Sequence, residues 1–430
     1  MLTVAYLANQ FPSAVEPYVI EEIEALSRRG VQVIAGSVRK PDEYSRRPAV
    51  AQSRAGIVCL QPLRVLTLVC ALGLIVKRWQ LIADLVSRAL LRGKESPRRR
   101  LKALLHTWLG AYYAVLLRKR SVEHIHVHHG YFGSWIAMVA ARLLGITYSL
   151  TLHGSDLLVN GSYLDAKLKN CRFCLTISEF NRDYIRARFP EIDPSKIVVS
   201  RLGVNVPEPA ATRWRTDSAQ RRFSLLAVGR LHAVKDHAFL VRACARLRDL
   251  GVDFTCAIAG DGPERQRLAA LIRQNHLQAR VSLLGHVARE PIDSLYRRAD
   301  LIVLTSRSEG LPLVLMEAMA RGGIALAPAI TGIPEIVIPG KTGFLYAPGN
   351  MEDFVGRIRF LQELMSGERH YATSRLDWIR HAARLQVLHN FNRTKNLTQF
   401  GDRFLQLTAP NDFTARDGSS RHEDFILQQV

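Results

Sequence analysis

Short apolar runs alternate with longer amphipathic stretches along most of the chain, which predicts a fold of alternating strands and helices. The first unit consists of an expected strand at 3–7, a helix at 17–29 that ends at Gly30, and a second strand at 31–35. Two strands joined by a helix are typical of a parallel sheet. The alternation continues with strands expected at 123–130, 148–152, 174–177, 196–199 and 201–204.

A polar, proline-containing segment at 206–222 interrupts this pattern and predicts a linker. After it the alternation restarts, with strands expected at 224–228, 254–259, 281–284, 301–304 and 324–327. Repeated strand–helix units on both sides of a linker predict two doubly wound, Rossmann-like α/β domains. We therefore expect domains at 1–205 and 223–385, a terminal helix at 386–408 and a loose tail at 409–430.

Residues 63–120 depart from the alternation. A long, mostly apolar helical stretch is expected at 63–91 and a second helix at 100–117, with thirteen Lys and Arg residues around them. Apolar helix faces rimmed by basic residues suit a helix that lies on anionic lipid. Each such residue near the surface contributes about 1 kcal/mol, less at high salt. An ordinary helix pair packed on the sheet, with a solvated basic edge, is the alternative.

The chain of 430 residues has a formal net charge of +21, which predicts attraction to an anionic partner. No nucleic-acid-binding motif accompanies this charge, so a phospholipid surface or a phosphorylated substrate is favoured. The longest apolar run, 65–76, is well below the roughly 18 to 20 residues that span a bilayer. The N-terminus also lacks a basic leader. These features predict a cytoplasmic protein that can attach peripherally to the inner face of the membrane.

Two groups of potential metal ligands are better explained without a metal. Cys171 and Cys174 form a lone Cys-x-x-Cys with no second pair at zinc-ligand spacing, which favours packing. His124, His126 and His128 would face the same side of a strand, but no carboxylate or cysteine in the sequence pattern completes a ligand set. We therefore expect a strand end beside a substrate cleft, with His129 on its border.

The stretch from Ser308 to Gly322 carries the strongest chemical signal. It follows the strand expected at 301–304 and contains a helix that Pro312 opens and Gly322 ends. The N–H groups near Gly310–Leu313 would lack intrahelical partners and form an anion site at the helix start. Glu309 precedes this start and Glu317 lies inside the helix. Carboxylates beside an anion site suit a ligand with hydroxyl groups and a phosphate, such as a nucleotide sugar.

Ligands of open parallel sheets gather beyond the carboxyl ends of the strands. The strand at 148–152 ends in His153-Gly154-Ser155-Asp156, which places His153 where chemistry is expected. The first strand of the second domain ends in Gly229-Arg230, and Lys235 follows in the same loop.

These residues resemble glycosyltransferase family 4, retaining enzymes of the GT-B fold, in which two Rossmann-like domains face a cleft. Glu309 and Glu317 match the family's Glu-x7-Glu motif. Gly-Leu-Pro follows Glu309, and Glu317 is the first residue of a Glu-Ala-Met-Ala sequence that the family also has. The N-terminal helix, with Glu21-Glu22-Ile23-Glu24-Ala25-Leu26 followed by Arg-Arg-Gly, resembles members of exopolysaccharide assembly. Many relatives have Gly-Gly in the first loop, where this chain has Asn9-Gln10.

The resemblance implies a role for each matching residue. Glu309 would bind the donor sugar, with His153 near it, and Glu317 would hold the ribose hydroxyls. Arg230 and Lys235 would stabilise the departing diphosphate. The implied catalytic residues are His153, Arg230, Lys235 and Glu309. The donor site would comprise Gly229, Arg230, Lys235, Gly260, His286, Val287, Glu309, Gly310, Leu311, Pro312, Leu313 and Glu317, and the acceptor side Asn9, Gln10, His129 and Asp156.

The resemblance therefore implies a retaining hexosyltransferase that uses a UDP- or GDP-linked sugar and a glycan or lipid-linked acceptor. No Asp-x-Asp triplet occurs in the sequence, which favours a reaction without metal or other cofactor. The resemblance also implies that the terminal helix crosses back to the first domain. Two alternatives are a nucleotide-sugar epimerase of the same architecture and a non-catalytic, membrane-associated binding protein.

Overall fold

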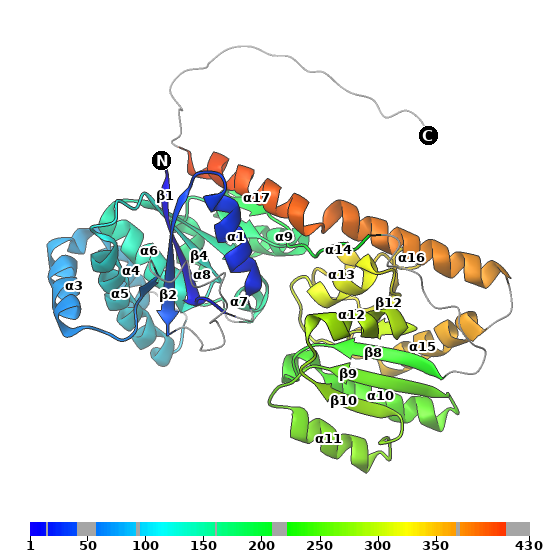
Figure 1. Ribbon diagram of the computed structural model, residues 1–430. Helices are drawn as coiled ribbons and strands as arrows, with labels where there is room; N and C mark the ends of the chain where they lie inside the picture. Colours follow the sequence, from blue (N-terminus) through cyan, green and yellow to red (C-terminus); the bar gives the residue numbers. More distant parts are fainter. Residues whose placement is uncertain are drawn as a thin grey trace, which may run out of the picture.

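The computed structural model describes residues 1–13, 16–40, 57–91, 95–159, 161–208, 222–366 and 370–409. Within these residues the strands form one sheet of seven and one of six, and every pairing between strands is parallel (Figure 1). The expected α/β class with two doubly wound domains is confirmed. Most of the expected linker and tail, at 209–221 and 410–430, lies outside the described residues.

The first sheet has the order β3-β2-β1-β4-β5-β6-β7. Its strands are β1 (Thr3–Gln10), β2 (Gln32–Arg39), β3 (Val58–Cys59), β4 (His124–His128), β5 (Thr147–Leu152), β6 (Cys174–Thr176) and β7 (Ile197–Val199). The helices of this domain are α1 (Pro17–Ser27), α3 (Val65–Lys77), α4 (Ala83–Leu90), α5 (Pro97–Leu117), α6 (Phe132–Leu144), α7 (Ser155–Leu158), α8 (Leu164–Asn170) and α9 (Glu179–Arg188), with short 3-10 helices η2 (Trp79–Leu81) and η3 (Pro194–Lys196).

The second sheet has the order β10-β9-β8-β11-β12-β13. Its strands are β8 (Phe223–Val228), β9 (Phe254–Ala259), β10 (Val281–Gly285), β11 (Leu301–Val303), β12 (Ala325–Pro328) and β13 (Phe344–Tyr346). Its helices are α10 (His237–Asp249), α11 (Arg265–Gln274), α12 (Arg289–Arg298), α13 (Leu313–Ala320), α14 (Ile333–Ile336), α15 (Met351–Ser366) and α16 (His370–Asn390), with the short 3-10 helix η5 (Ala233–Lys235). The last helix, α17 (Arg393–Thr408), follows α16.

Two expectations about local structure are wrong, and one strand was not predicted. The apolar stretch at 63–91 is divided into α3, η2 and α4, because the polar residues Lys77 and Arg78 end α3 and the Arg78 guanidinium binds the carbonyl of Leu143. Residues 201–204 form no strand but only a single bridge between Val204 and Asn392. The short strand β13, which is packed at the sheet edge, gave no sequence signal long enough to predict it.

The chain passes between the domains twice. It leaves the first domain after Val204 and returns at Asn392, where α16 ends and α17 begins. Two backbone hydrogen bonds join these passages, from Val204 N–H to the Phe391 carbonyl (2.9 Å) and from Arg393 N–H to the Val204 carbonyl (3.1 Å). Helices α16 and α17 run in succession along one side of both domains (Figure 1).

Helix α17 is packed on the first domain rather than on the second. Phe400 and Phe404 are buried with Phe173, Val4 and Leu26 of that domain in one apolar cluster. Burial of aromatic side chains stabilises such contacts by a few kcal/mol each, about 1.5–3 for a fully buried Phe. The C-terminal helix is therefore part of the N-terminal domain's core.

Candidate functional site

Three strand ends of the second sheet meet at one loop cluster. Gly260, just after β9, has φ +147°, and a Cβ there would lie 1.9 Å from the Gly229 carbonyl oxygen, so a side chain cannot fit. Gly260 N–H also donates to the Gly285 carbonyl at 2.8 Å. Arg230 and His286 follow these strand ends and are exposed, while Val287 packs against the apolar residues behind them. Arg230 forms no ion pair with any other residue that the structure describes.

Lys235 and Glu309 form an ion pair at the centre of this cluster. Lys235 Nζ lies 2.5 Å from Glu309 Oε1, and the hydroxyl of Ser306 donates to the same oxygen at 2.6 Å. Both charged side chains are largely buried, at 20% and 10% exposure. Thr331 holds the loop from the other side, since its hydroxyl donates to the Glu309 carbonyl at 2.6 Å. The sequence-predicted residues Lys235 and Glu309 are thus brought into direct contact.

Helix α13 begins beside Glu309. Pro312 has non-helical backbone angles and is the residue before the first helical one, Leu313. Leu311 and Pro312 are buried, so the loop that carries Gly310 is fixed on an apolar base. The first N–H groups of α13 have no acceptor within the helix and act, with Lys235, as a positive environment for an anion.

Glu317, one turn along α13, is oriented by a residue that the sequence did not single out. The hydroxyl of Tyr296 donates to Glu317 Oε2 at 3.0 Å, and the Tyr296 ring is fully buried. Arg321 lies over this ring, 5.6 Å from its centroid, and pairs with Asp293 at 2.5 Å. Nothing in the local sequence pattern shows which distant carboxylate the Tyr296 hydroxyl contacts, so the sequence alone does not identify this residue.

His153 directly follows β5, on the other side of the site. Its loop is fixed by Asp156, whose carboxylate accepts N–H groups of Gly130 (2.8 Å), His153 (3.1 Å) and Gly154 (2.8 Å). Asp156 has no exposed surface. The expected acceptor contact of Asp156 is therefore corrected: its side chain positions the His153 loop and has no face left for a ligand.

The His153 loop touches the Glu309 loop directly. A Cβ on Gly310 would lie 2.1 Å from the His153 carbonyl oxygen, and one on Gly154 would lie 3.1 Å from Gly310 Cα. The side-chain amide of Asn181 also donates to the His153 carbonyl at 3.2 Å. These contacts require glycine at 310 and bring the candidate residues of both domains to one place.

A buried chain of hydrogen bonds leads away from His153. His153 Nε2 lies 3.0 Å from His128 Nδ1, and His128 Nε2 lies 3.0 Å from Glu22 Oε2. The hydroxyl of Tyr6 also donates to Glu22. Burial, followed by the positive charge of His129, holds the pKa of His153 well below its usual range, which favours a neutral ring.

The expectation that no carboxylate joins the histidines of β4 is wrong, because Glu22 of α1 lies close to His126 and His128. Each ring nitrogen of His126 already has a partner: Nδ1 lies 2.7 Å from the Ser149 hydroxyl and Nε2 3.0 Å from that of Thr151. The group is accounted for by these hydrogen bonds, and we do not assign a metal to it.

His129, predicted on the acceptor side, is buried between two carboxylates. Its Nε2 lies 2.9 Å from Glu16 Oε1 and its Nδ1 3.6 Å from Asp156 Oδ2. Burial alone would lower the pKa of His129, but these carboxylates raise it to about 9. His129 is therefore protonated at neutral pH and holds the loops before α1 and after β5 together.

This ion cluster predicts a pH-dependent stability. Below about pH 6.5 the unfolded and folded chains both protonate His129, so its full contribution is present. Between about 6.5 and 9 the unfolded chain loses this proton first, so the contribution, of order 2 kcal/mol, declines with rising pH. We expect the stability difference between the native chain and His129→Gln to shrink across this window in urea titrations. The exposed His381→Gln gives the control, and a difference that stays constant with pH would contradict the charge assignment.

Asn9 and Gln10 lie at the carboxyl end of β1, where acceptor contacts were expected. Gln10 Nε2 donates to the Lys40 carbonyl at 3.2 Å. The Asn9 side-chain oxygen is buried, has no hydrogen-bond partner among the described residues, and would lie 3.1 Å from a Cβ at Gly133. Their part in acceptor binding remains a prediction.

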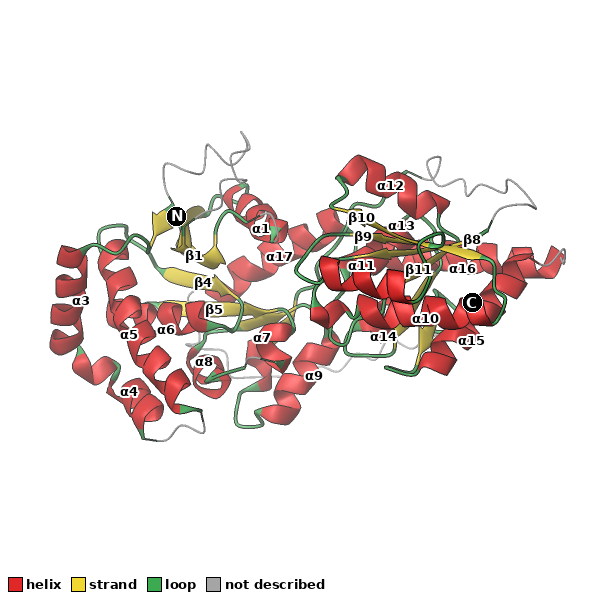
Figure 2. Cartoon of the chain, turned by 90° about the horizontal axis from the view of Figure 1, so that it is seen from below, coloured by secondary structure: helices red, strands yellow, loops and turns green. Residues whose placement is uncertain are grey.

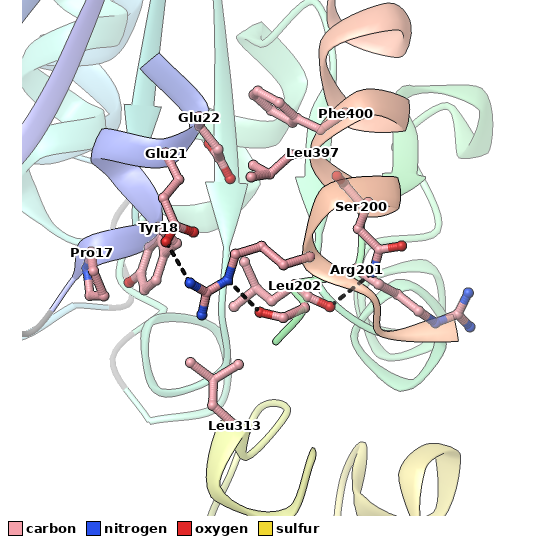
Figure 3. A pocket seen from close by; sticks show the side chains of 13 residues that line it. Pro17, Tyr18, Glu21, Glu22, Ser200, Arg201, Leu202, Leu313, Leu397 and Phe400 are labelled. Carbon is pink, nitrogen blue, oxygen red and sulfur yellow. Dashed lines mark hydrogen bonds and ion pairs between the residues drawn. The ribbon is translucent and has the colours of Figure 1, made fainter. Parts of the chain in front are cut away.

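A pocket opens beside this site, where the domains and α17 meet (Figure 3). Glu21 and Glu22 of α1, Leu397 and Phe400 of α17, and Leu313 of α13 line it. Arg393 pairs with Glu21 at 2.8 Å across it. Since Glu22 is at its wall, the hydrogen-bond chain from His153 ends at this pocket.

Comparison with known proteins covers both halves of the chain. Residues 15–207 match the family model described as Glycosyltransferase Family 4, and residues 210–376 match Glycosyl transferases group 1. The chain is 32% identical over 171 residues to a putative colanic acid biosynthesis glycosyltransferase WcaL of Salmonella typhimurium, and 30% identical over 204 residues to that of Escherichia coli. These matches cover 38% and 46% of this chain and 42% and 48% of the relatives, so the chain matches less than half the length of each.

Solved structures share the fold. Anabaena Alr3699/HepE in complex with UDP superimposes with a TM-score of 0.65 at 17% identity, over 94% of this chain and all of that one. At this identity the likeness shows the GT-B architecture alone, which agrees with the two sheets described above.

Proposed function

Because the chain belongs to the group 1 and family 4 glycosyltransferases, we propose that it transfers a hexose from a nucleotide-diphosphate sugar to a polysaccharide or lipid-linked acceptor. The observation that carries the proposal is the direct approach of the His153–Gly154 loop to Glu309 and Gly310. This contact brings a candidate residue of each domain together, which supports a reaction centre between the domains. The resemblance to retaining enzymes suggests that the anomeric configuration is kept.

The positive groups in the second domain suit a departing diphosphate. Lys235 pairs with Glu309 in the structure, so its charge is already fixed at the site and needs little reorganisation when the phosphate charge develops. Arg230 can supply a forked donor pair, and the start of α13 adds N–H groups. We propose that these groups stabilise the departing diphosphate, so that the reaction needs no divalent cation.

The donor would lie across the second sheet. We propose that Glu309 binds the sugar, that Glu317, held by Tyr296, takes the ribose hydroxyls, and that the base lies against His286 and Val287. UDP, present in the HepE structure, is the nucleotide that we favour for this chain. The relatives named for colanic acid biosynthesis support an exopolysaccharide or lipid-linked acceptor.

Transfer assays test the proposal. The purified protein is incubated with a panel of UDP- and GDP-hexoses and a glycan or lipid-linked acceptor, with and without EDTA, and both released nucleoside diphosphate and glycosylated acceptor are measured. We expect turnover with at least one donor, unaffected by EDTA, and a loss of tenfold or more in Glu309→Gln, about 1.4 kcal/mol in transition-state binding. Glu352→Gln, an exposed carboxylate remote from the cleft, is the matched control.

The alternatives give different results in the same assay. An epimerase would change the donor sugar or release free nucleotide with no acceptor glycosylated. A binding protein would raise the melting temperature with donor but release no nucleotide. Either result, or equal turnover by Glu309→Gln, would reject the glycosyltransferase proposal.

A further inference from the structure

A large share of the exposed apolar side chains lies on α3, α5 and the turn between α3 and α4, which we call the α3–α5 face. On α3, Val65, Leu66, Val69, Leu72 and Val76 are 74%, 82%, 62%, 54% and 72% exposed. The other members are Leu63, Trp79, Leu81, Leu101, Leu105 and Trp108. Monomeric proteins rarely leave so much contiguous apolar surface in water, so this face needs a partner.

The apolar residues form two adjacent stripes. Positions 65, 69, 72 and 76 follow helical spacing, so they share the outer side of α3, while the buried Ala71 faces α5. On α5, Leu101, Leu105 and Trp108 repeat the same spacing. The Trp108 indole N–H donates to the Leu68 carbonyl at 3.2 Å, which joins the two stripes into one surface.

The charges around this face have one sign. The segment 57–120 holds thirteen Lys and Arg residues and only two acids, Asp84 and Glu95. Both acids are already paired, with Arg142 and Arg88. Of the basic residues near the stripes, Arg64, Lys77, Arg98, Arg99 and Lys102 are exposed.

The position of the face fits a broad, flat partner. Helix α3 lies at the outer edge of the N-terminal domain, on the side away from the second domain, in both views (Figures 1 and 2). None of the helices in the described part of the chain is long and apolar enough to pass through a bilayer. Contact with a membrane would therefore be made at its surface.

A second copy of the chain is a poorer partner for this surface. A twofold dimer brings the same patch of each protomer together, so the basic rims would face each other. Anionic lipid instead combines apolar acyl chains with negative headgroups, and Trp side chains are favoured at that boundary.

We propose that the α3–α5 face is a docking surface for an anionic phospholipid bilayer, with the outer side of α3 inserted among the headgroups. The inference extends the proposed lipid-linked acceptor by assigning the surface that brings the enzyme to it. The test of this inference measures membrane binding and does not require turnover. The docking inference can therefore fail while the proposed function holds, and the proposed function can fail while the docking inference holds.

Binding of the protein to lipid vesicles tests the proposal. The protein is sedimented with vesicles of phosphatidylcholine alone or mixed with phosphatidylglycerol, and we expect binding only to the mixture, weakened by salt. Arg98→Gln, Arg99→Gln and Lys102→Gln together should weaken binding roughly a hundredfold. Leu66→Gln, Val69→Gln and Leu72→Gln together should weaken it at least tenfold, by about 1.4 kcal/mol or more.

Matched variants in the second domain serve as controls. Lys341→Gln, Arg359→Gln and Arg375→Gln change exposed charge, and Leu250→Gln, Phe360→Gln and Trp378→Gln change exposed apolar residues. All should bind like the native chain. Equal loss in a control triple, or full binding by the α3 triple, would overturn the assignment.

Cys70 provides a direct probe, since it is exposed on α3 while Cys59 is partly exposed and the other described cysteines are buried. A nitroxide on Cys70, in a Cys59→Ser background, should become accessible to oxygen and protected from a water-soluble relaxation agent when anionic vesicles are added. An unchanged signal would refute insertion. A dimer that the α3 triple dissociates, without vesicle binding, would assign the face to a second copy instead.

Discussion

Replacing Lys235 with Ala is expected to lower kcat/KM for the nucleotide sugar at least a hundredfold. The change removes a fixed positive charge from the site of the departing diphosphate, where one such donor is worth about 2.7–4 kcal/mol. It also leaves Glu309, which Lys235 contacts at 2.5 Å, as an unpaired and largely buried carboxylate. Both effects oppose the binding of a doubly charged leaving group.

The measurement is steady-state turnover with the donor identified by the panel, compared with Lys341→Ala as an exposed control. The double variant Lys235→Ala, Glu309→Gln should lose less than the product of the single losses, because the two side chains form one unit. Strictly multiplicative losses, or near-native turnover of Lys235→Ala with a native melting temperature, would contradict this role.

Replacing Glu22 with Gln, although Glu22 is separated from the cleft by His128 and His153, is expected to lower kcat/KM about tenfold to a hundredfold. We assign the Nε2–H of His128 as the donor to the Glu22 carboxylate, which leaves His128 Nδ1 to accept the Nε2–H of His153. In this arrangement Nδ1 of the neutral His153 carries no proton. Under the proposed function, this nitrogen is the acceptor for a substrate hydroxyl.

A Gln at position 22 can donate its amide to His128 and reverse the direction of the chain. His153 Nδ1 would then carry the proton and face the hydroxyl as a second donor, a buried mismatch of about 1–3 kcal/mol. The ¹⁵N shifts of the labelled His153 ring report the tautomer independently of activity. Loss of turnover with unchanged ring shifts would refute the positioning role, and Glu22→Asp should keep the native tautomer.

The sequence predicted the strand ends because their chemistry is local. Apolar runs locate β8 and β11 in the second sheet and β5 in the first. Arg230 and Glu309 follow β8 and β11 and must then lie at the carboxyl edge of the second sheet, while His153 follows β5 at the carboxyl edge of the first. The resemblance supplied the roles. The start of α13, next to Pro312, could be predicted for the same reason, because it depends on neighbouring residues.

Long-range pairings could not be predicted in this way. Glu22 and His128 are 106 residues apart, and their contact depends on how α1 packs over β4. The hydroxyl of Tyr296 reaches Glu317 only because α12 and α13 lie side by side. The burial of Asp156 likewise depends on three backbone N–H groups from two loops, whereas its sequence position suggested a free cleft residue.

The double passage of the chain between domains restricts how the enzyme can move. Gly203 lies so close to Arg393 that a Cβ would be 2.6 Å from its backbone nitrogen, so the two crossing segments are tied at one point. A movement that separates Gly203 from Arg393 would strain both crossing segments, whereas a rotation of one domain about this contact would leave them intact. We therefore expect any opening and closing of the two domains to pivot near this tie.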